Sequence, residues 1–563
     1  YNWREDVRPR VIGKFDEKGE WALPHGHWLL PAAGELSPAL IAQVIAARID
    51  RFFTSPRIRE RLAVIEAREK AAAAPAVSAV RTPYFCPGCP HNTSTRVPEG
   101  SGALAGIGCH FMTTWMGRNT TTFSHMGGEG CAWIGQAPFT GRQHMFVNIG
   151  DGTYFHSGIL AIRAAVASFN NKTAIGHTRA LPAGVTYKLL YNDAVAMTGG
   201  QPLDGIMTVP QLAQQLAAEG VGHIVVVTDG TPRAWHRADL PHGVPVRHRD
   251  EMDQIQRELR RCPGVSALIY DQTCAAEKRR RRKRGKFPDP PVRAFINEHV
   301  CEGCGDCSTA SNCLALVPVT TEFGRKRAID QSACNKDYAC LNGFCPSFVT
   351  VVGGQPRRGR GRALPGGATG TDLPLPALPP TAEPYGILIT GIGGTGVVTL
   401  GALIGMAAHL DGKGVTVLDV TGLAQKGGAV ISHVRIADDP ASLHAMRIAT
   451  AEADAILGGD AIVTASPEAL ARMRAGRTRV AVNTAQTPTA DFTHDREWRF
   501  PIDELTTSLQ ASVGAEAVHG LDATALATAL LGDALYANPL LLGFAWQQGL
   551  LPVSLAALLK AIE

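Results

Sequence analysis

The sequence predicts an α/β protein in which two helix-covered sheet domains flank a small, cysteine-rich α+β module. Three observations predict it: strand-like apolar runs alternate with helical patterns from Thr82 to Gln272, the alternation resumes after Tyr385, and seven cysteines gather between Cys301 and Cys345. Alternation of this kind favours a parallel sheet with helices on both faces. With 563 residues, the chain is long enough for three or four domains with their own cores.

The expected units follow one another without tandem repeats. Residues 1–80 form a connecting segment that is helical from Pro38 to Ala74, with a break near Ser55-Pro56. The remaining boundaries are a first sheet domain at 81–276, a basic linker at 277–292, the cysteine-rich module at 293–352, a Gly/Pro-rich linker at 353–384 and a smaller α/β domain at 385–563. Within the first sheet domain we expect strands at 143–149, 185–191, 223–227 and 266–270, and a helix at 158–168.

The composition is that of an ordinary soluble globular protein, with 45% hydrophobic residues, 19% charged residues and a net charge of +5. No apolar run has the length of a membrane span, and no signal-peptide pattern opens the chain. Most of the 13 cysteines cluster with metal-ligand spacing, which points to a reducing cytoplasm and excludes a secreted disulfide framework. The chain opens at Tyr1 and stops within a helical pattern, so we expect a piece of a longer polypeptide, with the smaller domain truncated.

The densest cysteine motif is Cys301-x2-Cys304-x2-Cys307. Its spacing lets one short loop aim three thiolates at a single [4Fe–4S] cube, whose remaining iron takes a distant cysteine before a proline. Cys345-Pro346 meets that requirement. The alternative is a zinc knuckle, because Cys-x2-Cys pairs also suit tetrahedral zinc.

Three further cysteines in the module, Cys313, Cys334 and Cys340, are left for a second cluster by the crossed pattern of two-cluster ferredoxins. That set is one thiolate short. A three-iron centre, a non-cysteine ligand and the absence of a second cluster all remain open.

Two polar motifs lie at neighbouring predicted strand ends: Gly150-Asp151-Gly152, and the run that begins at Asn192. Asp151, Asn192 and the carbonyl of Ala194 would supply three oxygen ligands to a divalent cation, as in the diphosphate site of thiamine enzymes. The carboxyl ends of parallel strands are where α/β sheets bind ligands. The alternative is a pair of structural turns.

At this point the chain resembles the 2-oxoacid:ferredoxin oxidoreductase family, and within it the fused bacterial indolepyruvate ferredoxin oxidoreductases. The resemblance is carried by three segments, Phe85–His91, Met126–Gly130 and Asn192–Gln201, and covers nearly the whole chain in the family's domain order. It implies an enzyme that decarboxylates a 2-oxoacid oxidatively, with thiamine diphosphate, Mg²⁺ and one to three [4Fe–4S] clusters. The implied coenzyme-binding residues are Gly150, Asp151, Gly152, Asn192, Ala194, Met197 and Thr198.

The resemblance also implies partners and substrates. Ferredoxin would accept the electrons, and coenzyme A the acyl group. An arylpyruvate such as indolepyruvate leads as the substrate; pyruvate or a branched-chain 2-oxoacid, and a non-catalytic electron-transfer subunit, are the alternatives. The glutamate that activates thiamine is expected outside this chain, on an upstream pyrimidine-binding domain or a partner subunit, in a homo- or hetero-oligomer.

Four more cysteines resemble the proximal cluster ligands of such enzymes: Cys86, Cys89, Cys109 and Cys274. The alternative is a buried thiol pair without metal. Cys131 and Cys262 have no partner at useful spacing and are expected to be ordinary cysteines.

One departure from the family concerns the coenzyme motifs, because Asp151 and Asn192 are 41 residues apart and the family usually has fewer than thirty. The surplus lies at residues 169–182. It includes Asn170-Asn171, which could be mistaken for the ligand pair but follows a predicted helix. The insertion could be a surface loop or could disturb the cation site.

Two other motifs have competing interpretations. Gly391-x-Gly393-x-x-Gly396 matches the dinucleotide fingerprint, with Asp419 as ribose ligand, but also resembles the family's smaller domain, where no nicotinamide is implied. The basic run from Lys278 to Lys286 lacks the aromatic residues and the fold of a nucleic-acid-binding protein. We expect a solvated connector, or a docking site for acidic ferredoxin or coenzyme A phosphates.

Overall fold

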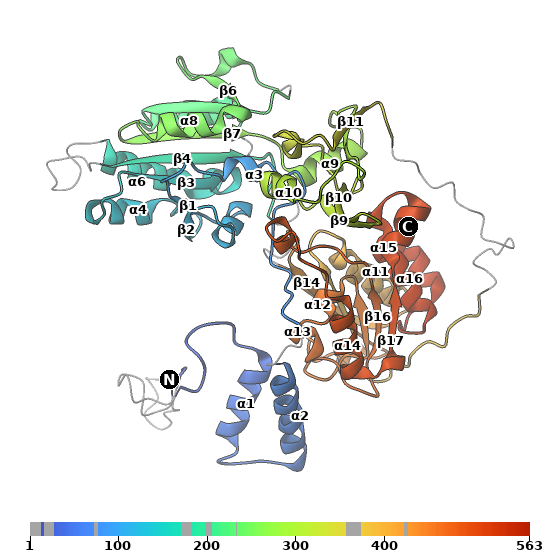
Figure 1. The fold of residues 1–563 in the computed structure, drawn as a ribbon. Coiled ribbons are helices and arrows are strands. Elements are labelled where there is room, and N and C mark those ends of the chain that lie inside the picture. The colour runs from blue at the N-terminus through green and yellow to red at the C-terminus, as the bar shows by residue number, and fades with distance from the viewer. Residues whose placement is uncertain are drawn as a thin grey trace, which may run out of the picture.

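The computed structural model describes residues 13–15, 28–72, 77–170, 183–197, 205, 207–231, 234–355, 373–421 and 426–563. The segment before the first sheet contains two helices, α1 (Pro38–Ile49) and α2 (Pro56–Ala72). The expected break at Ser55-Pro56 is therefore confirmed. Arg61 of α2 forms an ion pair with Glu452, which attaches this helix pair to the smaller domain (Figure 1).

The first sheet has seven strands, and all of its strand pairs are parallel. Its order is β2 (Thr120–Phe123), β1 (Ala103–Ala105), β3 (His144–Gly150), β4 (Gly184–Tyr191), β7 (Val265–Asp271), β5 (His223–Thr228) and β6 (Val246–His248). The central strands β3, β4 and β7 are buried along nearly their whole length, as expected for strands that are covered on both faces. The four expected strands are confirmed to within one or two residues.

Helices cover both faces of this sheet. The core on one face is formed with α4 (Cys131–Gln136), α6 (Ile159–Phe169) and α7 (Val209–Ala218), and the core on the other face with α8 (Met252–Leu259). Because every strand runs the same way, the loops after β3, β4 and β7 meet at one edge. That edge carries the polar motifs singled out in the sequence.

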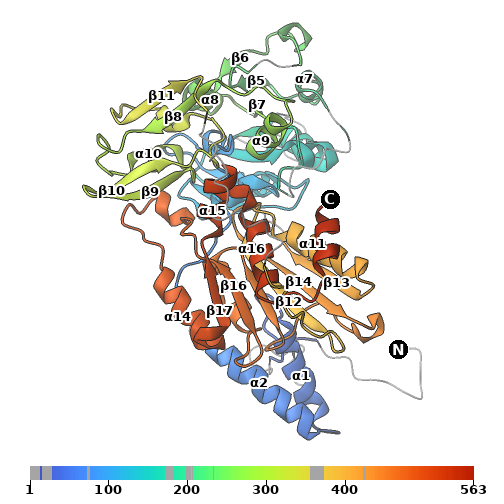
Figure 2. The ribbon, with the colours of Figure 1, turned by 90° about the vertical axis from the view of Figure 1, so that its right-hand side faces the viewer.

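The cysteine-rich module consists of two antiparallel strand pairs and a short helix. The pairs are β8 (Val292–Ile296) with β11 (Phe348–Val352), and β9 (Leu316–Thr321) with β10 (Gly324–Ile329); the helix is α10 (Asp306–Ser311). The module lies at the junction of the two larger domains in both views (Figures 1 and 2). Thr309 of α10 donates to the carbonyl of Thr493 in the smaller domain, at 3.3 Å.

The smaller domain has a six-stranded mixed sheet in the order β13 (Gly414–Val420), β14 (Ala429–Ala437), β12 (Tyr385–Ile392), β15 (Ala455–Gly458), β16 (Arg479–Asn483) and β17 (Val518–Leu521). Helices α11 (Val397–Leu410), α15 (Ala523–Leu531), α16 (Ala537–Gln547) and α17 (Leu555–Ile562) contribute to the core on one face. Helices α12 (Ala461–Thr464), α13 (Pro467–Leu470) and α14 (Ile502–Val513) contribute to the other.

The glycine motif of this domain lies between β12 and α11, as the sequence indicates. A Cβ at Gly391 would lie 2.7 Å from Val397 and 3.6 Å from Gly459, so this glycine permits close packing. Asp419 lies on β13, which β14 separates from β12. In a dinucleotide-binding site the acidic residue that binds the ribose would lie on the strand next to the one that leads into the glycine loop. Asp419 is not on that strand, so only the glycine motif still supports the dinucleotide interpretation.

The prediction of a basic linker at 277–292 is wrong for its first part, because the basic run there is helical. Helix α9 (Ala275–Lys283) buries Glu277 and Lys278, and its basic side chains pair with acidic residues of two domains. Lys278 pairs with Asp229 at 3.0 Å and Lys283 with Asp533 at 2.7 Å. These carboxylates neutralise the closely spaced cations, so the basic run is a packed part of the structure and not a solvated connector. None of the helices in the described ranges has both the length and the apolar character of a membrane crossing.

Candidate functional site

Asp151 and Asn192 meet at the carboxyl edge of the first sheet, although 41 residues separate them. Strands β3 and β4 are adjacent, so the residues that follow each strand are neighbours. Oδ2 of Asp151 accepts the backbone N–H groups of Asn192 at 3.0 Å and Asp193 at 2.9 Å, and Oδ1 accepts that of Gly152 at 2.9 Å. The extra residues of the insertion therefore do not separate the two motifs.

The competing asparagine lies at the opposite edge of the sheet. Asn170 ends α6, and its side chain donates to the carbonyl of Gly220 at 2.8 Å and accepts the N–H of Val265, the first residue of β7, at 3.0 Å. Asn170 is thus bound at the amino ends of the strands. Asn171 and Thr198 lie outside the described residues.

The donors at this edge fit a cation. Burial raises the pKa of Asp151 to about 6, against the opposing effect of its backbone hydrogen bonds, and a bound cation would stabilise its charged form. The three N–H groups that bond Asp151 use three of the roughly four lone-pair sites of the carboxylate, so one site on Oδ1 is left for a cation. Oδ1 of Asn192 is buried and has no hydrogen-bond partner among the described residues. Ala194, two residues after Asn192, is buried, and Met197 is half-buried.

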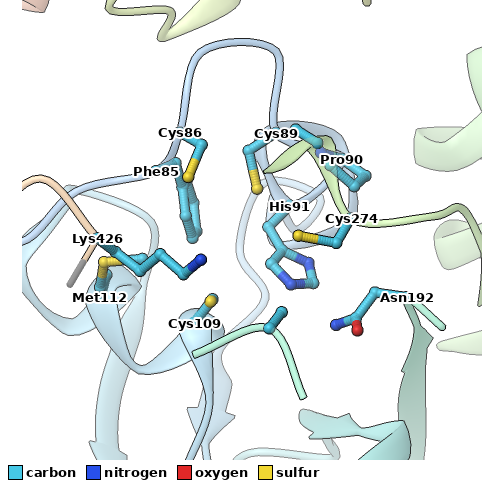
Figure 3. A pocket seen from close by; sticks show the side chains of 12 residues that line it. Phe85, Cys86, Cys89, Pro90, His91, Cys109, Met112, Asn192, Cys274 and Lys426 are labelled. Carbon is cyan, nitrogen blue, oxygen red and sulfur yellow. The ribbon is translucent and has the colours of Figure 1, made fainter. Parts of the chain in front are cut away.

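The four proximal cysteines line one cavity, together with Asn192 and Lys426 (Figure 3). They come from three separate segments: the loop of Cys86 and Cys89, the start of a 3₁₀ helix at Cys109, and the N-cap of α9 at Cys274. Their sulfur atoms point toward the same space in Figure 3. The chain therefore brings four thiols together at this cavity, and not only a pair.

Burial controls the ionisation of this cavity. It raises the pKa of Cys109 to about 12 and that of Cys86 and Cys89 above the usual value, and it lowers the pKa of His91 to about 4. Thiols in such surroundings deprotonate only when a metal replaces the proton. No three His, Cys, Asp or Glu side chains in the described ranges lie close enough together to share a single metal ion. The donor set of four thiols spread around a cavity fits a polynuclear iron–sulfur cluster, in which each thiolate binds a different iron.

The proximal cavity and the cation edge are joined by a hydrogen bond and by a residue that they share. The N–H of Cys274 donates to the carbonyl of Asn192 at 3.0 Å, and the side chain of Asn192 lines the cysteine cavity. Asn192 would therefore adjoin both a cluster in the cavity and a cation-bound coenzyme at the edge of the sheet.

The cysteines of the module line a second cavity, which is open at the surface. Cys301, Cys304, Cys307 and Cys345 are among its lining residues, as the sequence predicts, and so is Cys340. Cys304 and Cys345 are exposed, and Phe344 beside them is 99% exposed. Burial, with the charge of Cys313, Cys334 and Cys307 nearby, raises the pKa of Cys340 to about 12. Cys340 thus lies between the two predicted cysteine sets.

The module is attached directly to the proximal loop. The Asn335 side chain donates to the carbonyl of Pro87 at 2.7 Å, and the N–H of Gly88 bonds the thiol of Cys313. Gly88 has φ +65°, and a Cβ there would lie 3.0 Å from that of Asp337, so the loops pack backbone against backbone.

Sequence reasoning missed three buried groups near these sites. Lys426 reaches the proximal cavity from the smaller domain, and is 5% exposed. Although burial disfavours its charge, the surrounding cysteines raise its pKa. His110 Nε2 and Glu129 Oε1 are buried without a partner among the described residues. Glu129 lies within the Met126–Gly130 segment and His110 follows Cys109, and these positions were the available signal for those two residues. Cys131 is exposed and Cys262 half-buried, away from both cavities.

Two parts of the chain match models of known protein families. Residues 386–563 match the family described as pyruvate ferredoxin/flavodoxin oxidoreductase, and residues 1–75 match the indolepyruvate ferredoxin oxidoreductase middle domain. Indolepyruvate oxidoreductase subunit IorA of Thermococcus kodakarensis is 26% identical over 289 residues, which are 47% of this chain and 40% of IorA. Subunit IorB of Methanothermobacter thermautotrophicus is 29% identical over 161 residues, which are 29% of this chain and 77% of IorB.

The chain belongs to the 2-oxoacid:ferredoxin oxidoreductase family. Within it, the chain is indolepyruvate oxidoreductase-like and matches both the IorA and the IorB subunit, as a fused form does. It spans about two-fifths of the length of the IorA relatives that it matches.

Proposed function

We propose that this chain carries the diphosphate-binding half of a thiamine site and the electron relay of an indolepyruvate-type 2-oxoacid:ferredoxin oxidoreductase. One observation carries the proposal: four cysteines, three of them buried and Cys86 half-buried, line a cavity together with Asn192, whose side-chain oxygen is also available at the cation edge. The similarity to IorA and IorB supports an arylpyruvate as the substrate. The activating glutamate would come from outside this chain.

When bound with Mg²⁺, thiamine diphosphate would supply the electron sink for oxidative decarboxylation of the 2-oxoacid. The chain's own residues would hold and orient it. Asp151, the Asn192 side chain and the Ala194 carbonyl would bind the cation, and Gly150, Gly152, Met197 and Thr198 would adjoin the diphosphate. The three N–H groups that bond Asp151 fix its carboxylate before any cation arrives.

The relay would run outward through the contacts between the loops. Cys86, Cys89, Cys109 and Cys274 would hold the cluster nearest the coenzyme. The hydrogen bond from Gly88 to Cys313 would link it to the inner part of the module. The cluster of Cys301, Cys304, Cys307 and Cys345 would lie last, at the exposed face where ferredoxin could dock. Coenzyme A would accept the acyl group.

Two measurements on anaerobically prepared protein test the proposal. Iron and acid-labile sulfide are expected at about four atoms of each per cluster. Titration calorimetry with thiamine diphosphate is expected to give heat only when Mg²⁺ is present, and the Asp151→Ala variant should give none. Iron without Mg²⁺-dependent heat would favour the electron-transfer subunit. Protein that stays iron-free after cluster reconstitution would contradict the relay.

A further inference from the structure

The first cysteine loop of the module has a distinctive backbone. Cys301, Cys304 and Cys307 are spaced by two residues, and Cys304 is flanked by Gly303 at φ +72° and Gly305 at φ +85°. The N–H of Gly303 donates to Sγ of Cys301 at 3.4 Å. Two left-handed residues around the middle position turn its side chain toward the cavity that the other two cysteines line.

The second loop repeats this backbone without glycine. Cys334, Asp337 and Cys340 have the same two-residue spacing, and Asp337 is flanked by Lys336 at φ +54° and Tyr338 at φ +64°. The N–H of Lys336 donates to Sγ of Cys334 at 3.5 Å. Asp337 therefore occupies the position that Cys304, a predicted cluster ligand, has in the first loop.

The left-handed conformations at Lys336 and Tyr338 are informative because they are unfavourable for side chains other than glycine. Such strain persists where the surrounding structure requires a particular geometry, and it is concentrated at functional sites. A loop that only connected two strands would have no reason to repeat the two left-handed positions and the N–H to sulfur hydrogen bond of a predicted cluster-binding loop.

The surroundings of Asp337 leave one carboxylate oxygen available. Its side chain is 8% exposed, and Oδ1 accepts from Nη1 of Arg249 at 2.5 Å and from Nε2 of Gln272 at 3.5 Å. Nη2 of Arg249 donates to the main-chain oxygen of Asp337 at 2.7 Å. Oδ2 takes part in none of the hydrogen bonds found among the described residues. Arg249 thus fixes the carboxylate and compensates its charge through one oxygen only.

We propose that Asp337 is the fourth ligand of a second iron–sulfur cluster, whose other ligands are Cys313, Cys334 and Cys340. This rests on the proposed function, in that the module must carry clusters at all. The carboxylate of Asp337 then takes the place of the missing fourth thiolate, at the position that Cys304 has in the first loop.

A carboxylate oxygen is a harder donor than a thiolate, so the iron on Asp337 should be the one released most easily. Mild oxidation would convert the [4Fe–4S]²⁺ cluster into a [3Fe–4S]⁺ cluster, with release of Fe²⁺ and one electron. Ferricyanide, the oxidant added in the experiment, would accept that electron. Added Fe²⁺ and a reductant would reverse the step.

The test compares anaerobically reconstituted wild type with Asp337→Cys and Asp337→Ala, by iron and sulfide analysis and electron spin resonance. Wild type should hold about twelve irons per chain, and one equivalent of iron should leave reversibly on ferricyanide treatment, with the spin signal of a three-iron cluster. Asp337→Cys should keep all its iron under the same treatment. Asp337→Ala should contain the three-iron cluster before any oxidant is added.

Two variants separate a ligand from an ion-pair partner. Asp306→Ala removes a carboxylate that lines the cavity of the first loop but does not occupy a ligand position there. Arg249→Gln removes the ion pair and leaves the carboxylate. Asp306→Ala should behave as wild type, and Arg249→Gln should keep the fourth iron before oxidation, because the carboxylate that binds it is still present. If Arg249→Gln loses iron as Asp337→Ala does, Asp337 acts only through the ion pair.

The remaining outcomes are distinguishable. Equal iron content and identical oxidation behaviour of wild type and Asp337→Cys would overturn the assignment, even if Asp337→Ala did not fold. Wild type with about eight irons and no second module cluster would overturn it too, while leaving the proposed function intact. Protein without any iron would refute the proposed function itself.

Discussion

The two cysteine regions are assembled in different ways. Every predicted ligand of the module lies between Cys301 and Cys345, and spacing within a loop already directs three of the thiolates at one point. The proximal cavity combines segments from Cys86 to Cys274, and Lys426 is added from the smaller domain. The first region is local and the second depends on the packing of domains. A local site can keep its metal when distant contacts fail, whereas the proximal site cannot.

The largest effect is expected from Cys274→Ala. This change removes the one proximal thiol that follows β7, at the N-cap of α9, and the iron that it would bind is then left without a protein ligand in a buried cavity. We expect the loss of about four irons per chain and of electron transfer from the coenzyme site, with the module's spectrum unchanged. Cys262→Ala is the matched control and should keep all iron. Loss of the module's signal as well would show that the two regions are not independent.

Asp151→Ala tests the coenzyme edge beside the proximal cavity. Removing a direct cation ligand should weaken Mg²⁺-dependent thiamine diphosphate binding by more than the roughly 10–100-fold that loss of an outer-shell partner causes. Calorimetry measures this. The iron content should not change, because Asp151 does not line the cysteine cavity. Asp193→Ala keeps the backbone N–H that bonds Asp151 and removes only a carboxylate that pairs with Arg281, so this variant should bind nearly as wild type.

Arg81→Met tests the contact that brings the proximal loop to the smaller domain. Arg81 forms a buried ion pair with Asp460 at 2.6 Å, with 3% and 1% of the two side chains exposed. Removing one partner of a buried pair costs about 3–5 kcal/mol, because the other charge is left uncompensated. Chemical denaturation should show this loss. Arg257→Met breaks an exposed pair with Asp253 and should leave the free energy of unfolding nearly unchanged.

The smallest effect is expected from Lys426→Met, which removes a buried positive charge from the proximal cavity. A nearby cation favours the reduced, more negative cluster. At a fixed solution potential we expect an approximately tenfold lower ratio of reduced to oxidised proximal cluster, equivalent to about 59 mV for one electron. Redox titration followed by spin resonance measures it. The module's potential should not move, and Lys560→Met, a surface change in the same domain, should alter neither.

Much of the fold follows from the sequence. The strands ending near Ile149 and Tyr191 were located within a residue or two, because their apolar runs are long and are bounded by turn residues. The glycine loop between β12 and α11 was located for the same reason. The basic run was misjudged. Its charge pattern predicts solvation, and only the positions of Asp229 and Asp533 in other parts of the fold explain why it is a packed helix.

By itself, the sequence determined the donor chemistry: which residues are thiols, which are carboxylates, and how the loops of the module are spaced. It determined these because a few bonds of covalent chain fix what neighbouring residues can reach. Only the tertiary structure decided that Asp151 and Asn192 lie in contact despite the insertion between them. It also decided that Cys274 and Cys86 line one cavity, and that Lys426 reaches this cavity from the smaller domain. The order of strands in a sheet and the docking of domains set those distances, and neither is encoded in the separation along the chain.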